Sequence, residues 1–185
     1  GGGGGGGKAA PYRLLTRRDF AGTPEAMCFL GDDETLVVSV RDDNYLHYLN
    51  VASGAVQKVN MNQTGDDHVS FTALDLAASP DGRYLLVATD KSRLILYPTG
   101  SSMQLRSYYG ATNDELGQVR ACWHPSGAYV YCTSQDLKVY CWAVGSQRVA
   151  AQLKGHAATV RDVDVSPDGL SVVSCSFDKT LRVWR

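Results

Sequence analysis

A short apolar pattern recurs four times in this 185-residue chain. It occupies residues 46–49 (LHYL), 94–97 (LILY), 139–142 (VYCW) and 181–184 (LRVW), with starts 48, 45 and 42 residues apart (46 to 94, 94 to 139, 139 to 181). A repeat of this length indicates one supersecondary unit copied several times. Because a single unit cannot bury its own apolar faces, neighbouring units must stack on one another. The period therefore predicts a repeat array, which disfavours an enzyme.

A proline–glycine turn stands at the same place in three of the units. The turns are residues 79–82 (SPDG), 124–127 (HPSG) and 166–169 (SPDG), and the first unit has 31–34 (GDDE) in their place. Proline fixes φ at one position, and glycine permits positive φ two residues later. When the four units are aligned on the recurring apolar pattern, these turns also fall at matching positions.

Apolar segments flank each turn, and most of them are rich in β-branched or aromatic residues. Those before the turns are 26–29, 74–77, 119–123 and 160–165, and those after them are 36–39, 84–88, 129–133 and 171–175. A more polar segment follows the recurring pattern in three units, at 56–59, 103–107 and 148–153. Such runs, bounded by glycine, proline and aspartate, are typical of strands. No segment has a helical period, so the sequence predicts an all-β array with four short strands per unit.

The final unit resembles a WD-repeat (WD40) unit. The resemblance is carried by residues 153–156 (LKGH), 163–169 (VDVSPDG) and 174–184 (SCSFDKTLRVW). It implies a β-propeller of four-stranded antiparallel blades, with about four blades present as part of a ring of seven or eight, within the usual range for propellers. The resemblance covers residues 12–185, and its specific motifs are dense only in the last unit.

The resemblance also implies a structural hydrogen-bond network in the last unit. Its members would be His156, Ser174 (or Ser176), Asp178 and Trp184. The other units depart from this pattern. Unit three keeps Asp136 and Trp142 without the histidine, unit two has Lys91 in the aspartate column, and unit one keeps Ser39 and Asp43 with Leu49 in the tryptophan column.

The domain organisation follows from the register. Residues 1–11 form a glycine-rich, low-complexity leader without expected structure, and residues 12–185 form the array. The expected blades are 19–59, 68–107, 117–153 and 156–185, and residues 12–18 would supply a closing strand beside 181–184 if the array is a self-contained ring. Three arrangements remain open: part of a larger propeller with further blades, half of a ring made with another chain, or a small four-blade array.

Composition excludes some classes of function. The 18 Lys and Arg against 19 Asp and Glu give a net charge of −1, and no basic stripe favours a nucleic-acid partner. No apolar run is long enough to span a membrane, and no charged-then-apolar leader is found. Five cysteines, an odd number without tight spacing, indicate reduced thiols. We expect an intracellular protein, cytoplasmic or nuclear, without a membrane partner.

Several residue sets imitate chemical sites. Ser174, His156 and Asp178 would form a hydrolase set, but the same residues satisfy the structural network. Cys122, His124 and Cys132 lack the spacing of zinc ligands. Residues 2–9 nearly spell a phosphate loop, but Ala9 lacks the hydroxyl that this motif needs. The sequence therefore predicts no catalytic residue, no metal and no cofactor.

What remains is the surface formed by the loops. The long connections 60–70 and 108–118 and the turns 41–45 and 90–93 should gather on one face. The candidate partner-binding residues there are Arg41, Asn62, Asp66, Asp67, Lys91, Arg93, Tyr108, Tyr109, Asn113, Asp114 and Glu115. The expected function is a non-catalytic scaffold or adaptor that binds other proteins. The alternative is a hydrolase- or lactonase-like propeller enzyme, because residues 79–88 (SPDGRYLLVA) also suit other propeller repeats.

Overall fold

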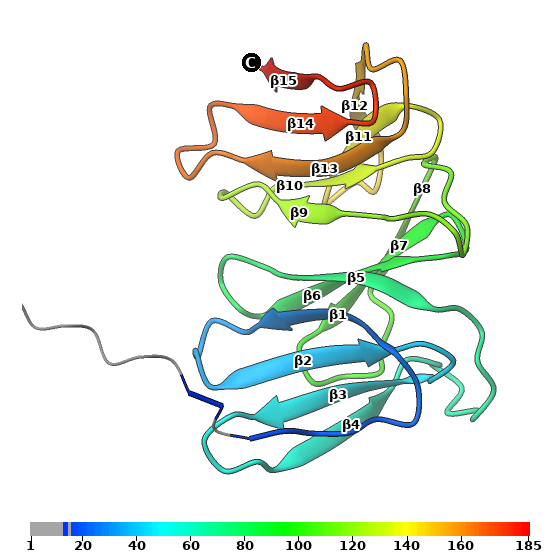
Figure 1. Cartoon of the computed structure of the whole chain (residues 1–185), viewed down its shortest axis with the longest axis vertical. Coiled ribbons are helices and arrows are strands. Elements are labelled where there is room, and N and C mark those ends of the chain that lie inside the picture. Colours follow the sequence, from blue (N-terminus) through cyan, green and yellow to red (C-terminus); the bar gives the residue numbers. More distant parts are fainter. Residues whose placement is uncertain (1–12, 15) are drawn as a thin grey trace, which may run out of the picture.

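The computed structural model describes residues 13–14 and 16–185, so the glycine-rich leader of residues 1–11 lies outside the described part. The described residues form fifteen strands in four antiparallel sheets, and none of them is helical. No helix in this part of the chain is therefore long and apolar enough to cross a membrane. The four sheets follow one another along the chain (Figure 1).

Each sheet is built from consecutive strands. The first contains β1 (Pro24–Phe29), β2 (Thr35–Val40), β3 (Tyr45–Asn50) and β4 (Val56–Asn60). The second contains β5 (Ala73–Ala78), β6 (Tyr84–Thr89), β7 (Arg93–Pro98) and β8 (Arg106–Tyr109). The third contains β9 (Ala121–Trp123), β10 (Tyr129–Thr133), β11 (Lys138–Ala143) and β12 (Val149–Lys154), and the fourth contains β13 (Val160–Val165), β14 (Val172–Ser176) and β15 (Leu181–Trp184). The predicted all-β class is confirmed, and the first three units have the predicted four strands, whereas the fourth sheet has three.

The turn of the first unit lies one residue earlier than the sequence register predicts. The Leu30 N–H donates to the Thr35 carbonyl at 2.9 Å, as the Ser79 N–H donates to the Tyr84 carbonyl at 2.8 Å. Asp33, with a φ of 56°, therefore takes the place of Gly82, whose φ is 70°. Aspartate tolerates this left-handed conformation better than most residues, so the turn forms without glycine.

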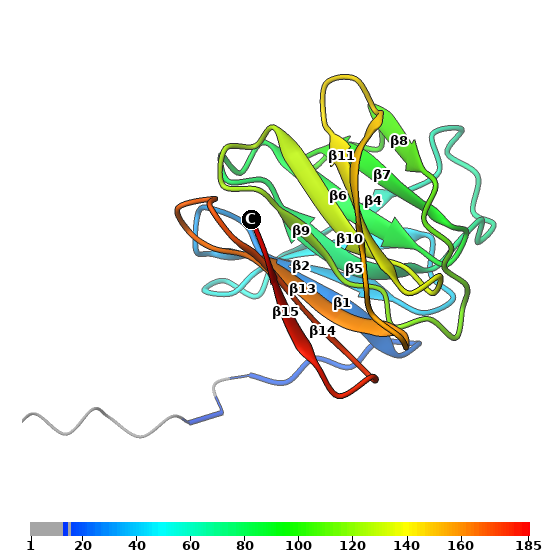
Figure 2. The same cartoon turned by 90° about the horizontal axis from the view of Figure 1, so that it is seen from above.

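The apolar cores lie between the sheets. Val37, Leu46 and Tyr48 of the first sheet pack against Leu85 and Ile95 of the second. A second core joins sheets two and three, and a third core joins sheets three and four. Seen from above, the sheets overlap one another with their strands progressively rotated (Figure 2). Each unit thus completes its burial with its neighbour, as the repeat period predicted.

Hydrogen bonds reinforce these junctions. The Tyr97 hydroxyl donates to the Met61 carbonyl at 3.0 Å, and Trp142 Nε1 donates to the Tyr109 carbonyl at 2.9 Å. In both cases an aromatic residue of the third strand contacts the connection or outer strand of the preceding sheet. A buried polar tip that finds a partner in this way fixes the stagger between neighbouring sheets.

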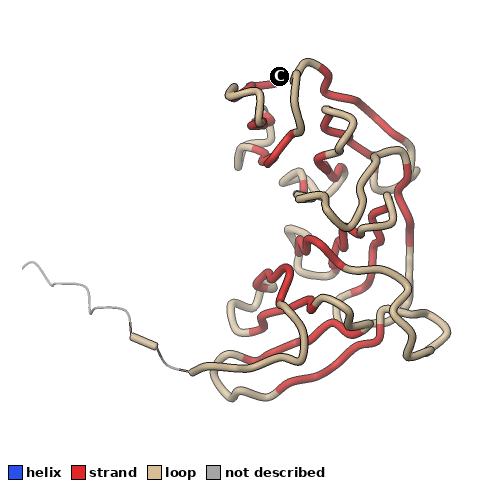
Figure 3. The backbone as a smooth tube through the Cα atoms, turned by 45° about the vertical axis from the view of Figure 1, so that its right-hand side comes forward, coloured by secondary structure: helices blue, strands red, loops and turns tan. Residues whose placement is uncertain are grey.

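The four sheets form an open arc (Figure 3). The closing strand that residues 12–18 would supply in a self-contained ring is not seen in the described part: residues 13–14 and 16–18 belong to no strand, and Tyr12 and Leu15 lie outside the described residues. The first described residues lie near β3 and β4, at the opposite end of the stack from β15 (Figure 1). There Phe20 packs edge-on against His47, with 5.3 Å between ring centroids. The segment therefore lies against the first sheet and does not approach the fourth.

Candidate interaction surface

The loops that carry the predicted partner-binding residues share one end of the sheets. Because consecutive strands are antiparallel, the second-to-third-strand turns and the sheet-to-sheet connections emerge at the same end. We call this end the loop face, formed by residues 41–44, 61–72, 90–92, 110–120, 134–137, 155–159 and 177–180.

The structure brings together all four expected network residues of the last unit. His156 Nδ1 lies 2.8 Å from Asp178 Oδ2, and His156 Nε2 lies 2.8 Å from the Ser174 hydroxyl. Trp184 Nε1 donates to the same hydroxyl at 3.0 Å. The hydroxyl of Thr180 and the N–H of Ala157, together with His156, hold the pKa of Asp178 below its usual range. An ionised Asp178 thus ties the connection before β13 to the turn before β15.

The same geometry removes Ser174 from any hydrolytic role. Its side chain is fully buried, and its oxygen already accepts the Trp184 N–H while facing the His156 ring. A nucleophile needs an exposed oxygen with space for a substrate carbonyl beside it. The set that imitates a hydrolase triad is therefore a packing element of the fourth sheet.

The equivalent turn aspartates of two other sheets use different partners. In the first sheet Asp43 Oδ2 lies 2.8 Å from His47 Nε2, a histidine supplied by β3. In the third sheet Asp136 accepts from Lys138 at 2.5 Å and from the Tyr140 hydroxyl at 2.8 Å. The sequence analysis did not identify His47, because it expected the histidine in the connection before the first strand. His47 instead lies on the third strand of its sheet, β3.

Three predicted partner-binding residues are buried, which corrects their assignment. The Asn62 amide donates to the Asp66 and His68 carbonyls at 2.8 and 2.6 Å and so shapes its own loop. Tyr108 is fully buried, and burial raises its pKa to about 12. Asn113 donates to the Thr133 carbonyl at 3.3 Å. These side chains hold the loops in place and are out of reach of a partner.

The other predicted residues remain accessible to different degrees. Exposed members are Asp66, Asp67, Lys91, Tyr109, Asp114 and Glu115, whereas Arg41 and Arg93 are partly buried. Arg93 lies over the Phe71 ring, 5.1 Å from its centroid, and Arg41 is paired with Glu25. Among the predicted partner-binding residues, Arg41 and Glu115 are the two that line the hollows described next for residues 13–14 and 16–185.

Two adjoining hollows lie on the loop face. The first, of about 510 Å³, is lined by Glu25, Arg41, Leu74, residues 115–120 and Arg161. The second, of about 440 Å³, shares residues 116–118 and Arg161 and adds Gln135, Thr159, Val160 and Phe177. The first, second and fourth units therefore contribute to the first hollow, together with the connection between the second and third sheets.

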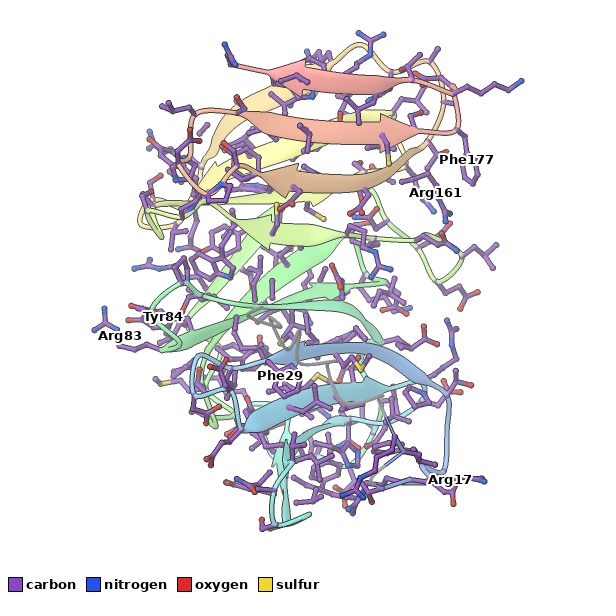
Figure 4. All side chains as sticks on the ribbon, turned by 60° about the vertical axis from the view of Figure 1, so that its left-hand side comes forward. Arg17, Phe29, Arg83, Tyr84, Arg161 and Phe177 are labelled. Carbon is purple, nitrogen blue, oxygen red and sulfur yellow. The ribbon has the colours of Figure 1, made fainter. Side chains whose placement is uncertain are left out.

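Exposed apolar side chains border these hollows. Leu116 is 86% exposed and Phe177 is 63% exposed. The Arg161 guanidinium lies over the Phe177 ring at 4.6 Å, within cation–π range. The two residues lie together at one edge of the sheets, and the pair of Arg83 and Tyr84 lies at the opposite edge (Figure 4).

Sequence reasoning missed Phe177, although a signal was present. The N–H groups of Arg41, Gln135 and Phe177 donate to the carbonyls of residues 23, 112 and 159, which places these residues in one column with Asp90. Three of the four members are polar. Phe177 is the aromatic exception among these aligned positions. Comparison of the four turns would therefore have indicated it as a candidate binding residue.

The three arginines of the hollows differ in their ion pairing. Arg41 pairs with Glu25, and Arg120 lies 3.3 Å from the Asp75 carboxylate. Within residues 13–14 and 16–185, Arg161 forms no ion pair, and its guanidinium instead makes the cation–π contact with the Phe177 ring. In the same part of the chain, no three histidine, cysteine, aspartate or glutamate side chains converge in a way that could hold a metal ion.

Comparison with known proteins agrees with this architecture. Residues 103–143 and 147–185 match the family described as "WD domain, G-beta repeat". The chain is 35% identical over 99 residues to DDB1- and CUL4-associated factor 13 of Danio rerio, covering 52% of this chain and 21% of that protein. It is 32% identical over 78 residues to the U5 small nuclear ribonucleoprotein 40 kDa protein of Dictyostelium discoideum, covering 42% and 22% respectively.

A solved structure shows the same fold. The crystal structure of the RRP9 WD40 repeats superposes with a TM-score of 0.74 at 22% identity, over 90% of this chain and 49% of that one. The chain thus spans about half of this structure and about a fifth of the two relatives. Residues 103–143 and 147–185 are therefore WD repeats, and the described chain as a whole has the fold of the WD40 repeats in that structure, a β-propeller arrangement.

Proposed function

We propose that this chain is a non-catalytic scaffold or adaptor that binds another protein through its loop face. The observation that carries the proposal is the group formed by Leu116, Arg161 and Phe177 beside the two hollows. Aromatic and arginine side chains that are exposed before binding are the usual anchors of protein contacts. The named relatives support such a role, since one is described as associated with DDB1 and CUL4 and the other as part of a small nuclear ribonucleoprotein.

The proposal excludes catalysis and a bound cofactor. Its support is the burial of Ser174, the serine that would otherwise complete a hydrolase set. It also assigns the protein to the interior of the cell, in the cytoplasm or nucleus. All five cysteines are free, and burial raises the pKa of Cys28 to about 11 and of Cys122 to about 12, as expected for inert, reduced thiols.

Quantitative affinity capture tests the binding surface. We expect Phe177→Ala and Arg161→Ala to reduce recovery of the specific partners at least about tenfold, the effect of losing an anchor residue. The matched control is Arg83→Ala with Tyr84→Ala, because this pair has the same arginine-over-aromatic arrangement at the opposite end of the sheets. Recovery that falls equally with the control pair, or does not fall with Phe177→Ala, would contradict the proposed surface.

A further inference from the structure

The end of the sheets opposite the loop face carries the first-to-second-strand turns and the third-to-fourth-strand turns. The first-to-second-strand turns lie on the left of Figure 1. We call this end the turn face, formed by residues 30–34, 51–55, 79–83, 99–105, 124–128, 144–148 and 166–171. Neighbouring sheets meet at three junctions on this face. The middle junction, between the second and third sheets, differs from the other two.

At the two outer junctions, the turns of neighbouring sheets pack closely. A Cβ placed on Gly169 would lie 2.7 Å from the His124 ring, whose Nε2 is 3.1 Å from the Gly169 carbonyl oxygen. A Cβ placed on Gly82 would lie 3.7 Å from the backbone nitrogen of Gly31. The turn glycines of sheets two and four are therefore packed against the turn of the preceding sheet.

The middle junction lacks this contact. A Cβ placed on Gly127 would meet no atom of the described residues within 4 Å. The residue in the place of His124 is Ser79, whose hydroxyl donates to Asp81 at 2.6 Å and accepts the Tyr84 N–H at 2.9 Å. A short side chain that is bound within its own turn does not reach the next sheet. The sequence thus leaves a gap between two sheets that lie inside the array.

A hollow of about 400 Å³ occupies this gap. Its apolar walls include Pro80 and Tyr84 from the second sheet and Trp123 and Pro125 from the third. The Trp123 indole is held in place because its Nε1 donates to the Ala77 carbonyl at 3.0 Å. Walls of aromatic rings are the common feature of grooves that bind extended, proline-rich segments.

The polar groups of the hollow further define what it can bind. Asp81 Oδ2 accepts from Arg83 Nε at 2.7 Å, so the charges of these two residues compensate each other. The Ser79 hydroxyl and Arg83 hold the pKa of Asp81 at about 2. Within residues 13–14 and 16–185, the Tyr84 hydroxyl and the terminal nitrogens of Arg83 form no hydrogen bond. The hollow therefore has no net charge and offers side-chain donors.

A polyproline II segment complements this combination. Proline has no backbone N–H, and a polyproline II backbone makes no internal hydrogen bonds, so the segment presents carbonyl acceptors without donors. The Tyr84 hydroxyl and the Arg83 guanidinium can donate to these carbonyls while proline rings pack against the apolar walls. Because the charges of Asp81 and Arg83 cancel, the hollow gives no advantage to an acidic or a basic segment.

A second hollow continues the path toward the first sheet. It has a volume of about 370 Å³, shares Pro80, Asp81 and Arg83 with the first hollow, and extends to Gly31 and Thr99. Arg83 therefore borders both hollows. A polyproline II segment advances by about 3.1 Å per residue, so a segment of several residues that crosses the turn of the second sheet can contact both.

We propose that the turn face binds a proline-rich segment of another protein in the hollow between the second and third sheets. Tyr84 and Trp123 contact the proline rings, and the Tyr84 hydroxyl and Arg83 donate to the carbonyls of the segment. Arg83 and Tyr84 lie at the edge of the sheets opposite Arg161 and Phe177 (Figure 4). The turn face thus binds a different protein from the loop face, and binding at the loop face does not depend on Arg83 or Tyr84.

Titration with a fluorescein-labelled decaproline peptide tests the proposal. We expect saturable binding that Tyr84→Phe weakens about 3–10-fold, the effect of losing one hydrogen bond. Tyr129→Phe is the matched control, because Tyr129 begins β10 as Tyr84 begins β6 but does not line the hollow. Tyr129→Phe and Phe177→Ala should both leave the Kd of the peptide unchanged.

The indole N–H signals of the three tryptophans locate the bound peptide. Trp123 lines the hollow, whereas Trp142 is fully buried and Trp184 belongs to the network of the fourth sheet. In ¹⁵N-labelled protein, decaproline should shift the Trp123 signal and leave the other two signals in place. Trp142→Phe and Trp184→Phe assign the signals.

Three results would overturn the proposal. The first is a lack of saturable decaproline binding at concentrations up to about 1 mM. The second is the same Kd for Tyr84→Phe and Tyr129→Phe, or a shift of the Trp184 signal in place of the Trp123 signal. The third is tighter binding of a proline-free acidic peptide of the same length that Arg83→Gln abolishes, because the site would then select an anion.

Discussion

Ser174 is the residue on which the network of the fourth sheet depends. Its hydroxyl lies between the His156 ring and the Trp184 indole, at 2.8 and 3.0 Å. Both of these groups lose their partner if the hydroxyl is removed, and buried polar groups without partners are costly. The corresponding column of the third sheet holds Cys132, and Trp142 there donates instead to the backbone of the preceding sheet.

Removing this hydroxyl should therefore show coupling within the sheet. We expect Ser174→Ala to lower the free energy of unfolding by about 1–3 kcal/mol. Combined with Trp184→Phe, which removes the stranded N–H, the loss should be smaller than the sum of the two single losses by at least about 0.5 kcal/mol. Urea denaturation of the four proteins measures the difference. Trp142→Phe is the control, and its loss should add to that of Ser174→Ala; additive losses for the Trp184 pair would refute the coupling.

Individual positions of the interaction surface were only partly predictable from the sequence. Arg41 and Glu115 were assigned to the loop face and line a hollow there. Asn62, Tyr108 and Asn113 were also assigned to it but are buried, because polar and aromatic side chains in long connections serve to anchor those connections. Loop position alone does not reveal which way a side chain points. Comparison within one turn column, as for Phe177, does carry that information.

At the scale of the element, the turns determine the strands. Pro80, Pro125 and Pro167, with the glycines that follow, were sufficient to place the first and second strands of three sheets. In the first sheet the strands were predicted in place but the turn between them was predicted one residue too late, because Asp33 adopts the left-handed conformation that was expected of a glycine. The outer strand β8 begins at Arg106, three residues after the predicted start, and the chain first forms a turn after Pro98, whose carbonyl accepts the Ser101 N–H at 3.1 Å.

The left-handed turn position offers a stability test with opposite signs. Asp33→Gly should raise the free energy of unfolding by about 0.5–1 kcal/mol, because glycine relieves the unfavourable φ of 56°. Gly127→Ala should lower it by about 1–2 kcal/mol. A Cβ at Gly127 would meet no atom within 4 Å, so this loss reports backbone conformation alone. Thermal melts that show a loss for Asp33→Gly would contradict the assignment of Asp33 to the glycine column.

At the scale of the whole molecule, the sequence predicted stacking but not the form of the array. The repeat period required neighbouring units to bury one another, and the three cores between sheets do so. It did not predict whether the array closes, because closure depends on long-range geometry that no local pattern encodes. The described structure is an open arc in which residues 13–14 and 16–18 do not pair with β15 (Figure 3).

The central claim is that each sheet is stabilised by burial against the next, and one pair of variants tests it most directly. Leu94 and Leu181 occupy the same column, with 1% and 67% exposure. In the 185-residue chain, we expect Leu94→Asn to lower the free energy of unfolding by at least about 3 kcal/mol, whereas Leu181→Asn should change it by less than about 0.5 kcal/mol. Denaturation of the two variants under identical conditions gives the comparison. Equal losses would show that sheet-to-sheet burial does not stabilise the array.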